Sequence, residues 1–497
     1  MSDDQKSLQQ IIDFRLKKLN TLREDGVNPY PTNFDPSHTS ETIKSNYNKL
    51  EGETVKIAGR IMAIRKMGKA SFAQVMDSEG RIQFFIKRDD VGDKLYAHFK
   101  LLDIGDYVGV EGTVFTTKTG EITIHTSILT ILAKSIRPLP IVKEKDGEVF
   151  DAFTDKEQRY RNRHLDLILN SEVKETFIKR AAIIKSIRKF LDEKGFLEVE
   201  TPVLQPLYGG ANARPFTTHH HALDHTLFLR IADELYLKRL IIGGIDRVYE
   251  IAKDFRNEGM DRNHNPEFTM LEFYWAYADY EDCMDLVENM IQETAEKVEA
   301  LNVVWGGMDI DLSKNFERKS FLELLKEATG HDLGNINEDQ LRKVCKEKDV
   351  EVGDNDNYGQ MLDELMSQLV EPHLINPTFV IDYPKAISPL AKAHRNGDPN
   401  LVERFELFIG GAEFANSFSE LNDPIDQRQR LEAQAILKKR GDEEAQPVDE
   451  NFIQAMECGM PPTGGVGIGI DRITMLLTGN RWIKDVILFP ALRPENF

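Results

Sequence analysis

The sequence predicts an α+β protein in which a small five-stranded barrel precedes a larger domain, an antiparallel sheet flanked by helices. Residues 54–133 alternate apolar and polar side chains in short runs separated by glycine-containing turns, which is typical of strands. Residues 134–160 are charged and contain Pro138 and Pro140, so they predict a connector between domains. The remaining residues combine a strand-like hairpin with helical segments, which indicates the second architecture.

The bulk composition is that of a globular protein. The 497 residues are 41% hydrophobic and 29% charged, so the chain can bury substantial cores and is not broadly disordered. Its formal net charge of −20 argues against nucleic-acid binding through bulk electrostatics, but it leaves room for a local basic face. Any RNA would therefore be bound locally.

The cysteines and the first residues argue against two protein classes. Cys283, Cys345 and Cys458 are far apart, and they form neither a CxxC zinc pair nor a disulfide framework. The first ten residues are polar, and the sequence lacks a run of about 18 apolar residues. We therefore expect a cytoplasmic protein that is neither secreted nor membrane-spanning.

Residues 8–23 predict an amphipathic helix near the N-terminus. Its basic residues suit either a solvated packing helix or a contact with an RNA backbone, and the pattern leaves both open. The apolar positions at helical spacing are Leu8, Ile12, Leu16, Leu19 and Leu22.

Five short strands within residues 54–133 fit a small closed barrel, for which the OB-fold is the leading candidate. The expected inward positions are Ile82, Phe84, Ile86, Ile122, Ile124 and Ile128, and the expected outward positions are Gln83, Phe85, Lys87, Glu121, Thr123 and His125. An OB-fold binds single strands by stacking bases on aromatic rings and by hydrogen bonds to base edges. Phe72 and Gln83 have side chains for these two contacts, although Phe72 also suits a plain core position.

A long helix is expected to begin the second domain, with Ser171 as a plausible cap and Gly195 as its stop. Strand-like residues 196–201 follow and end at Pro202. Because proline cannot donate to a central ladder, this strand predicts a sheet edge or an interface. The predicted domains are residues 1–140 for the helix and barrel, 141–165 for a linker, and 166–497 for the second domain with a helical insertion.

Residues 248–280 predict an antiparallel hairpin whose polar break runs from Gly259 to Pro266. In its second strand, a period of two places Glu272 and Tyr274 on one face, together with Phe268 and Met270. Glu272 is then a carboxylate among apolar neighbours, or an acid that simply faces water.

Three features before the hairpin have modest chemical content. Residues 209–216 form a close-approach turn rather than a phosphate loop, because no GxxxxGK[ST] motif follows. Glu234 lies near the start of a predicted helix, where the dipole favours a carboxylate. The histidines at 219, 220, 221 and 225 lack acidic or cysteine partners at ligand spacing, so we do not expect a metal there.

Two later segments carry further charged groups. Residues 403–424 alternate so that Glu406 lies opposite the more apolar face, and Glu413, Asn416 and Glu420 follow it closely. Residues 464–477 are a glycine-rich run that leads into an apolar helix, which Asp471 can cap. Arg472 opposes the dipole at the first turn of that helix, so a bound anion explains it better than helix stability does.

Together these segments resemble the three signature motifs of the class II aminoacyl-tRNA synthetases. The helix and strand ending at Pro202 resemble motif 1, RNEGMDRNHNPEFTMLEFYWAYADY (residues 256–280) resembles motif 2, and GIGIDR (residues 467–472) resembles motif 3. The tail LEFYWAYADY narrows the resemblance to the lysyl-tRNA synthetase family. GKASFAQVMDSEGRIQFF (residues 68–85) is similar to the anticodon-binding barrel of that family.

The resemblance implies an ATP-dependent, Mg²⁺-requiring ligase that joins lysine to tRNA through a lysyl-adenylate, and a homodimer formed through motif 1. The implied lysine contacts are Gly210, Glu234, Glu272, Tyr274, Asn416 and Glu420. The implied ATP contacts are Arg256, Glu258, His264, Phe268 and Arg472, of which Arg256 and Arg472 are the implied catalytic residues. The implied magnesium ligands are Glu406 and Glu413, and the implied anticodon contacts are Phe72, Gln83 and Glu121.

Two positions depart from the family pattern. Ala412 stands where a basic residue is common, and Ser417 stands where a glycine or an alanine is common. Because of these two departures, the family pattern does not determine the pocket volume near the substrate.

Three rival functions remain to be separated from this one. An aspartate or asparagine synthetase needs a cation in its side-chain pocket, where Glu272 and Glu420 supply anions. A ligase that attaches lysine to a translation factor would lack the N-terminal barrel. A non-catalytic RNA-binding or regulatory relative would have no need of Arg256, Glu413 and Arg472.

Overall fold

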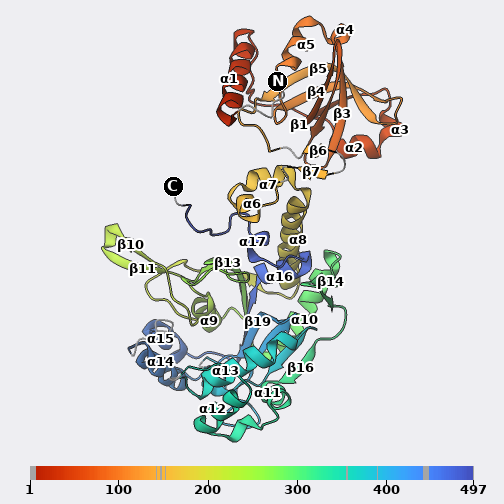
Figure 1. The fold of residues 1–497 in the computed structure, drawn as a ribbon. Coiled ribbons are helices and arrows are strands. Elements are labelled where there is room, and N and C mark those ends of the chain that lie inside the picture. The colour runs from red at the N-terminus through yellow and green to blue at the C-terminus, as the bar shows by residue number, and fades with distance from the viewer. Residues whose placement is uncertain are drawn as a thin grey trace. The chain divides into compact units, whose positions relative to one another are not determined.

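The computed structural model of the chain (Figure 1) describes residues 7–140, 143–145, 148–150, 153–353, 356–388, 390–439 and 447–495. The chain divides into two compact units, Met1–Thr154 and Asp155–Phe497. The predicted linker, residues 141–165, includes residues outside the described ranges, so its bounds stay a prediction. Within the described part of the chain, every helix is too short or too polar to cross a membrane.

The first unit contains the predicted five-stranded closed barrel. The strands follow one another around the barrel in the order β1-β2-β3-β5-β4, and only the β3–β5 pairing is parallel. Their bounds are β1 Thr54–Met67, β2 Ala70–Met76, β3 Arg81–Lys87, β4 Tyr107–Thr116 and β5 Ile122–Ala133. The helices of this unit are α1 Leu8–Glu24, α2 Ser40–Ser45, α3 Tyr47–Leu50, α4 Arg88–Val91 and α5 Asp93–Lys100, and a hairpin of β6 Lys143–Lys145 and β7 Glu148–Phe150 follows the barrel.

Helix α1 forms as predicted, but its buried face differs from the predicted apolar stripe. Of the five expected apolar positions only Leu19 and Leu22 are buried, and Leu8 is half exposed. Arg15 is buried instead, and its guanidinium donates hydrogen bonds to the backbone carbonyls of Ile104, Ser135 and Arg137. Hydropathy spacing misses this position because arginine is counted as polar, although it can pack when its donors are satisfied.

A bulge in β5 makes the inward prediction for Ile128 wrong. Gly112 of β4 pairs with Thr126, whereas Glu111 pairs with Ile128, so Ser127 is an extra residue and the faces exchange beyond it. Ile128 is accordingly 50% exposed, and Leu129 is buried. Thr123 lies on the outward face as predicted, directly opposite Gln83, but it is buried there and its hydroxyl accepts a hydrogen bond from Gln83 Nε2.

The second unit is built on an eight-stranded sheet in the order β16-β17-β18-β19-β20-β13-β12-β8. The six central strands are antiparallel, and β8 and β16 pair in parallel at the two ends. The edge position predicted for the strand before Pro202 is therefore confirmed, because β8 is the last strand. The bounds are β8 Leu197–Glu198, β12 Arg247–Phe255, β13 Glu267–Ala276, β16 Glu317–Ser320, β17 Thr378–Ile381, β18 Arg404–Ile409, β19 Ala412–Ser419 and β20 Thr463–Gly469.

Three helices cover one face of this sheet, and their apolar side chains form its core (Figure 1). They are α8 Ser171–Glu193, α10 Tyr280–Lys297 and α16 Ile470–Thr478. Leu271 and Phe273 of β13 are fully buried among them, so the opposite face of β13 is left for Met270, Glu272 and Tyr274, as the period of two predicts. The cap of α8 is Asn170 rather than the expected Ser171.

The remaining elements surround this sheet. Of these, the elements before β12 in the sequence are α6 Lys156–Arg161, α7 Arg163–Leu169, α9 Glu234–Ile242 and a three-stranded sheet of β9 Leu204–Gln205, β10 Thr217–His220 and β11 His225–Leu229. The insertion consists of the hairpin β14 Asn302–Trp305 and β15 Met308–Asp311, whose Trp305 and Ile310 join the core of the large sheet, and of helices α11 Phe321–Thr329, α12 Glu338–Glu347 and α13 Tyr358–Leu369, which share a second core with Val380 and Phe408 of the sheet. Helices α14 Pro424–Lys439, α15 Glu450–Glu457 and α17 Ile483–Val486 complete the unit.

Candidate functional site

A cavity of about 440 Å³ lies on the face of the large sheet that the three core helices leave open. This volume is typical of small-ligand sites. All but one of the lysine, ATP and metal residues predicted for the second unit line this cavity, namely Gly210, Glu234, Arg256, Glu258, His264, Phe268, Glu272, Tyr274, Glu413, Asn416, Glu420 and Arg472. The structure thus brings together residues that are more than 200 positions apart in the sequence.

Strand register separates the cavity into two ends. Phe268 and Tyr274 are six residues apart on β13, which corresponds to about 20 Å at the rise of a strand. On β20, Gly469 pairs with Met270 and Gly465 pairs with Tyr274. Arg472, three residues after Gly469, therefore lies toward the Phe268 end. The Tyr274 end has a carboxylate wall, which is formed by Glu234, Glu272 and Glu420.

Cationic groups gather at the Phe268 end. The guanidinium of Arg256 lies 5.1 Å from the centre of the Phe268 ring, in the range of a cation–π contact. His264 Nδ1 lies 2.8 Å from Asp261 Oδ2, which orients the imidazole, and His264 Nε2 lies 3.3 Å from Arg472 Nη2. These side chains form a ready site for an anion next to an aromatic surface.

Anionic groups gather at the Tyr274 end around Glu272, which is buried. The Tyr274 hydroxyl donates to Glu272 Oε2 at 3.1 Å, and the backbone N–H of Asp233 donates to Glu272 Oε1 at 3.3 Å. Burial, followed by the charges of Asp254 and Glu234, raises the pKa of Glu272 well above its ordinary value. A bound cation would relieve this unfavourable charge.

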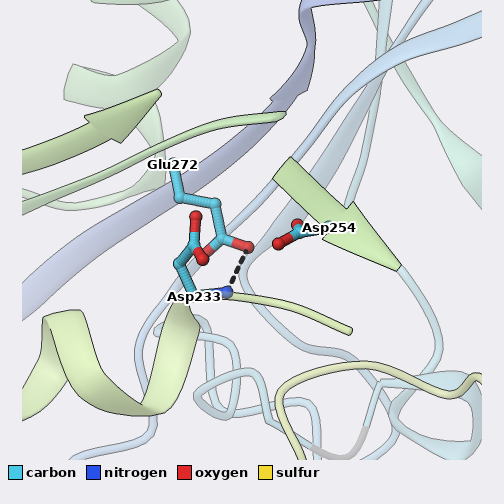
Figure 2. Close-up of side chains that lie close together, drawn as sticks. All are labelled: Asp233, Asp254 and Glu272. Carbon is cyan, nitrogen blue, oxygen red and sulfur yellow. Dashed lines mark hydrogen bonds between the residues drawn. The ribbon is translucent and has the colours of Figure 1, made fainter. Parts of the chain in front are cut away.

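Glu272 belongs to a three-carboxylate cluster that sequence reasoning missed. Figure 2 shows Asp233, Asp254 and Glu272 turned toward one another, and their oxygens lie within 4.8 Å of each other. Arg230 already offsets part of this charge, since its Nη1 lies 3.1 Å from Asp233 Oδ1 and its Nε lies 3.4 Å from Asp254 Oδ1. No spacing signal links these positions, because they come from the residue before α9, from β12 and from β13.

Small residues make room for this wall. A Cβ on Gly465 of β20 would lie 2.0 Å from Glu420 Oε1 and 2.5 Å from the Tyr274 ring. Gly210 has φ +87°, and a Cβ there would lie 3.0 Å from the Cβ of Glu234. The predicted close approach of both glycine segments is thus present, and any side chain would collide with the wall.

The predicted metal residues lie on the β18–β19 hairpin. Glu413 lines the cavity, whereas Glu406 is mostly buried behind it, accepts a hydrogen bond from the Tyr383 hydroxyl at 2.8 Å and contacts Arg404. Burial and the nearby charge of Glu413 raise the pKa of Glu406 to about 6, against the opposing effect of Arg404. Burial and the charges of Glu406 and Glu413 also raise the pKa of Glu371 to about 7. This surplus of carboxylate oxygens fits a magnesium ion.

Comparison with known protein families identifies both units. The family described as "tRNA synthetases class II (D, K and N)" matches residues 155–493, and the one described as "OB-fold nucleic acid binding domain" matches residues 55–137. The chain belongs to the class II tRNA synthetases. The lysine--tRNA ligase of Carboxydothermus hydrogenoformans is 52% identical over 495 residues, covering 99% of this chain and 100% of that protein. The lysine--tRNA ligase of Porphyromonas gingivalis is 51% identical over 493 residues, covering 97% and 85%.

An ion pair that sequence reasoning did not find holds the motif 3 helix of this synthetase. Asp471 was expected to cap α16, but the cap position is Gly469 because the helix follows β20 directly. Asp471 instead accepts a hydrogen bond from the Thr269 backbone N–H at 2.7 Å and lies 2.7 Å from Arg180 Nη1 of α8. These contacts fix the helix turn that carries Arg472.

Arg404 is another site residue that sequence reasoning missed. It lines the cavity, and its Nε donates to Asn416 Oδ1 at 3.1 Å. The two departures from the family pattern, Ala412 and Ser417, do not line the cavity. Their effect on the pocket is therefore indirect.

The outer face of the barrel carries a row of aromatic side chains. Phe72 is half-buried and lies outside the barrel core, with its ring centre 4.8 Å from that of Phe85. His125 lies 5.4 Å from Phe85 and 6.0 Å from Phe115. The core alternative for Phe72 is therefore wrong, and the face has the flat rings on which nucleic-acid bases stack.

We predict that Asp254→Asn changes how the stability of the second unit depends on pH. Burial raises the pKa of Asp254 to about 6, against the charges of Arg230 and Arg256. The folded state then binds more protons than the unfolded state, so the wild-type free energy of unfolding falls as the pH rises from about 4 to about 6. The variant lacks this loss and should gain about 1–3 kcal/mol relative to wild type between these pH values.

Tryptophan fluorescence during denaturant unfolding reports this change, since Trp275, Trp305 and Trp482 all lie in the second unit. Asp309→Asn, at an exposed position of the second unit, is the matched control. A flat difference for Asp254→Asn would contradict the assignment of a raised pKa.

Proposed function

We infer that this chain is a lysine–tRNA ligase that uses ATP to join lysine to tRNA. Both relatives with that name match nearly the whole chain. The observation that carries the inference in the structure is the buried wall of carboxylates at one end of the cavity. A wall of this charge suits a substrate with a cationic side chain.

The reaction proceeds in two steps. In the first, an oxygen of the lysine carboxylate attacks the α-phosphate of ATP, and pyrophosphate leaves. In the second, a hydroxyl of the terminal ribose of tRNA attacks the carbonyl carbon of the lysyl-adenylate, and AMP leaves. Because the lysine carboxylate is itself the first nucleophile, the first step needs alignment and charge neutralisation rather than a protein base.

The proposed ATP contacts lie at the Phe268 end. Arg256 is assigned to the α-phosphate and Phe268 to the adenine, which is supported by their adjacency in the cavity. His264 and Arg472 are assigned to the outer phosphates, and Glu258 lies on the same loop. Glu406 and Glu413 would hold the magnesium ion, which supplies further neutralisation of phosphate charge when bound.

The proposed lysine contacts lie at the other end. Glu272 and Tyr274 are assigned to the side-chain ammonium, with Glu420 on the same wall, and Glu234 beside Gly210 is assigned to the α-amino group. Asn416 is assigned to the lysine carboxylate. The Oδ1 atom of Asn416 already accepts from Arg404, so the amide N–H groups remain as donors for a carboxylate.

Aspartate or asparagine activation is the closest rival, because one family description covers synthetases of type D, K and N. An aspartate side chain would meet Glu272 as a like charge in a buried site. The carboxylate wall therefore favours lysine.

Pyrophosphate exchange into ATP, measured across the amino acids and followed by charging of bulk tRNA, tests this function. Lysine should support the fastest exchange, and Glu272→Gln should raise the KM for lysine about 100-fold with little change in the KM for ATP, since a buried charge pair loses one partner. Glu267→Gln, at an exposed position of the same strand, is the matched control. Faster exchange with aspartate or asparagine than with lysine would overturn the substrate assignment.

We propose that the aromatic face of the barrel reads the anticodon through Phe72, Gln83 and Glu121. Removing one stacking ring typically costs about 1–3 kcal/mol, so Phe72→Ala should reduce the kcat/KM for tRNA charging about 5- to 150-fold. It should leave pyrophosphate exchange unchanged, because that step needs no tRNA. Ile128→Ala removes an exposed barrel side chain without a ring and should do neither. Equal losses in charging and exchange for Phe72→Ala would contradict the proposal.

We further propose a homodimer that forms at the β8 edge of the large sheet. Unpaired edge strands and exposed apolar side chains favour association, and this region exposes Leu197, Val203, Leu204 and Leu207. Light scattering should give twice the chain mass of 56.8 kDa, and an active monomer would refute the dimer. The proposed compartment is the cytoplasm, which suits the three free cysteines and is testable by cell fractionation.

A further inference from the structure

A lysine of the protein itself lies against the carboxylate wall. Lys238 of α9 is fully buried, and its Nζ lies 2.5 Å from Glu234 Oε1 and in contact with Glu420 Oε2. The same Nζ lies 5.9 Å from the centre of the Tyr274 ring and 5.6 Å from that of Phe418. All four neighbours of Lys238 line the cavity, whereas Lys238 does not.

The Lys238 ammonium is charged in this position. Burial lowers its pKa, but the charges of Glu234 and Glu420 outweigh burial and raise the pKa above its ordinary value. Glu234 and Lys238 are four residues apart on α9 and share one face of the helix. Glu420 reaches the same ammonium from the end of β19, so two distant parts of the cavity wall are joined through one cation.

This cation changes the charge that the wall presents to a ligand. Glu234, Glu272 and Glu420 are the carboxylates of this wall, and the Lys238 ammonium lies against two of them, Glu234 and Glu420. Glu272 has other neighbours: its oxygens lie within 4.8 Å of those of Asp233 and Asp254, and Arg230 lies against both of these aspartates.

We propose that Lys238 is a positioning residue that determines specificity: its ammonium holds Glu234 and Glu420 in place, so that Glu234 meets the α-amino group of the ligand and Glu272 meets its side-chain ammonium. This inference rests on the proposed function and deepens it. Glu420 then acts on the substrate chiefly as part of a fixed ion pair. Glu272 is the carboxylate that is left to bind the side-chain ammonium of the substrate.

A charge-removal cycle tests the proposal. Lys238→Met keeps a long side chain and leaves Glu420 buried without its cation, so the KM for lysine in pyrophosphate exchange should rise at least about 10-fold. The KM for ATP should stay within about 2-fold, because ATP lies at the other end of the cavity. In a Glu420→Gln background the same substitution should raise the KM for lysine by a clearly smaller factor, since Glu234 is then the one carboxylate of the pair that loses its cation.

The cycle separates this role from a purely structural one. A change of scaffold stability would raise both KM values or lower kcat by the same factor in both backgrounds, and that result would overturn the proposal. Lys189→Met, at an exposed position of α8, is the matched control and should leave both KM values unchanged. If Lys238→Met does not fold, the double variant carries the test, and a KM for lysine more than about 10-fold above that of Glu420→Gln alone overturns the proposal. A wild-type enzyme that fails to activate lysine contradicts the proposed function, whereas equal effects in both backgrounds contradict only this inference.

Discussion

The double pairing of β13 is the constraint on which the rest of the site depends. This strand is hydrogen-bonded to β12 on one side and to β20 on the other, so it can neither slip nor rotate without breaking two ladders. Leu271 and Phe273 must then enter the dry core, and Glu272 and Tyr274 must face the cavity. A slip by one residue would place the carboxylate among apolar side chains, where it has no partner.

The two ends of β13 lie beside groups of opposite charge. Arg256 and Phe268 lie where β13 begins, and Tyr274 lies near its end. The two ends are therefore far enough apart that cationic and anionic groups do not cancel. An extended molecule with a phosphate at one end and an ammonium at the other matches this arrangement, and an adenylate of lysine has that form.

Buried cations of the chain hold the carboxylates that the site uses. Arg230 lies against the cluster behind Glu272, Lys238 joins Glu234 to Glu420, and Arg404 contacts Glu406 while it orients Asn416. A buried carboxylate without such a partner would take up a proton and lose its charge. The cations thereby preserve both the charge and the direction of groups that bind substrate.

The sequence by itself determined the barrel, the β12–β13 hairpin and the long helix α8, and its resemblance to a known family named twelve of the residues that line the cavity. Alternation, turn residues and motif order are local properties of the sequence. They can be recognised without knowing which segments meet in the fold. Only the tertiary structure decided that Arg15 packs, that Ser127 bulges and turns Ile128 outward, and that Asp471 ties helices together rather than capping one. It alone also placed Asp233, Asp254, Lys238 and Arg404 at the site. Their roles depend on which distant segments meet in a buried environment. There the neighbouring groups, rather than the position in the sequence, determine how a charge interacts.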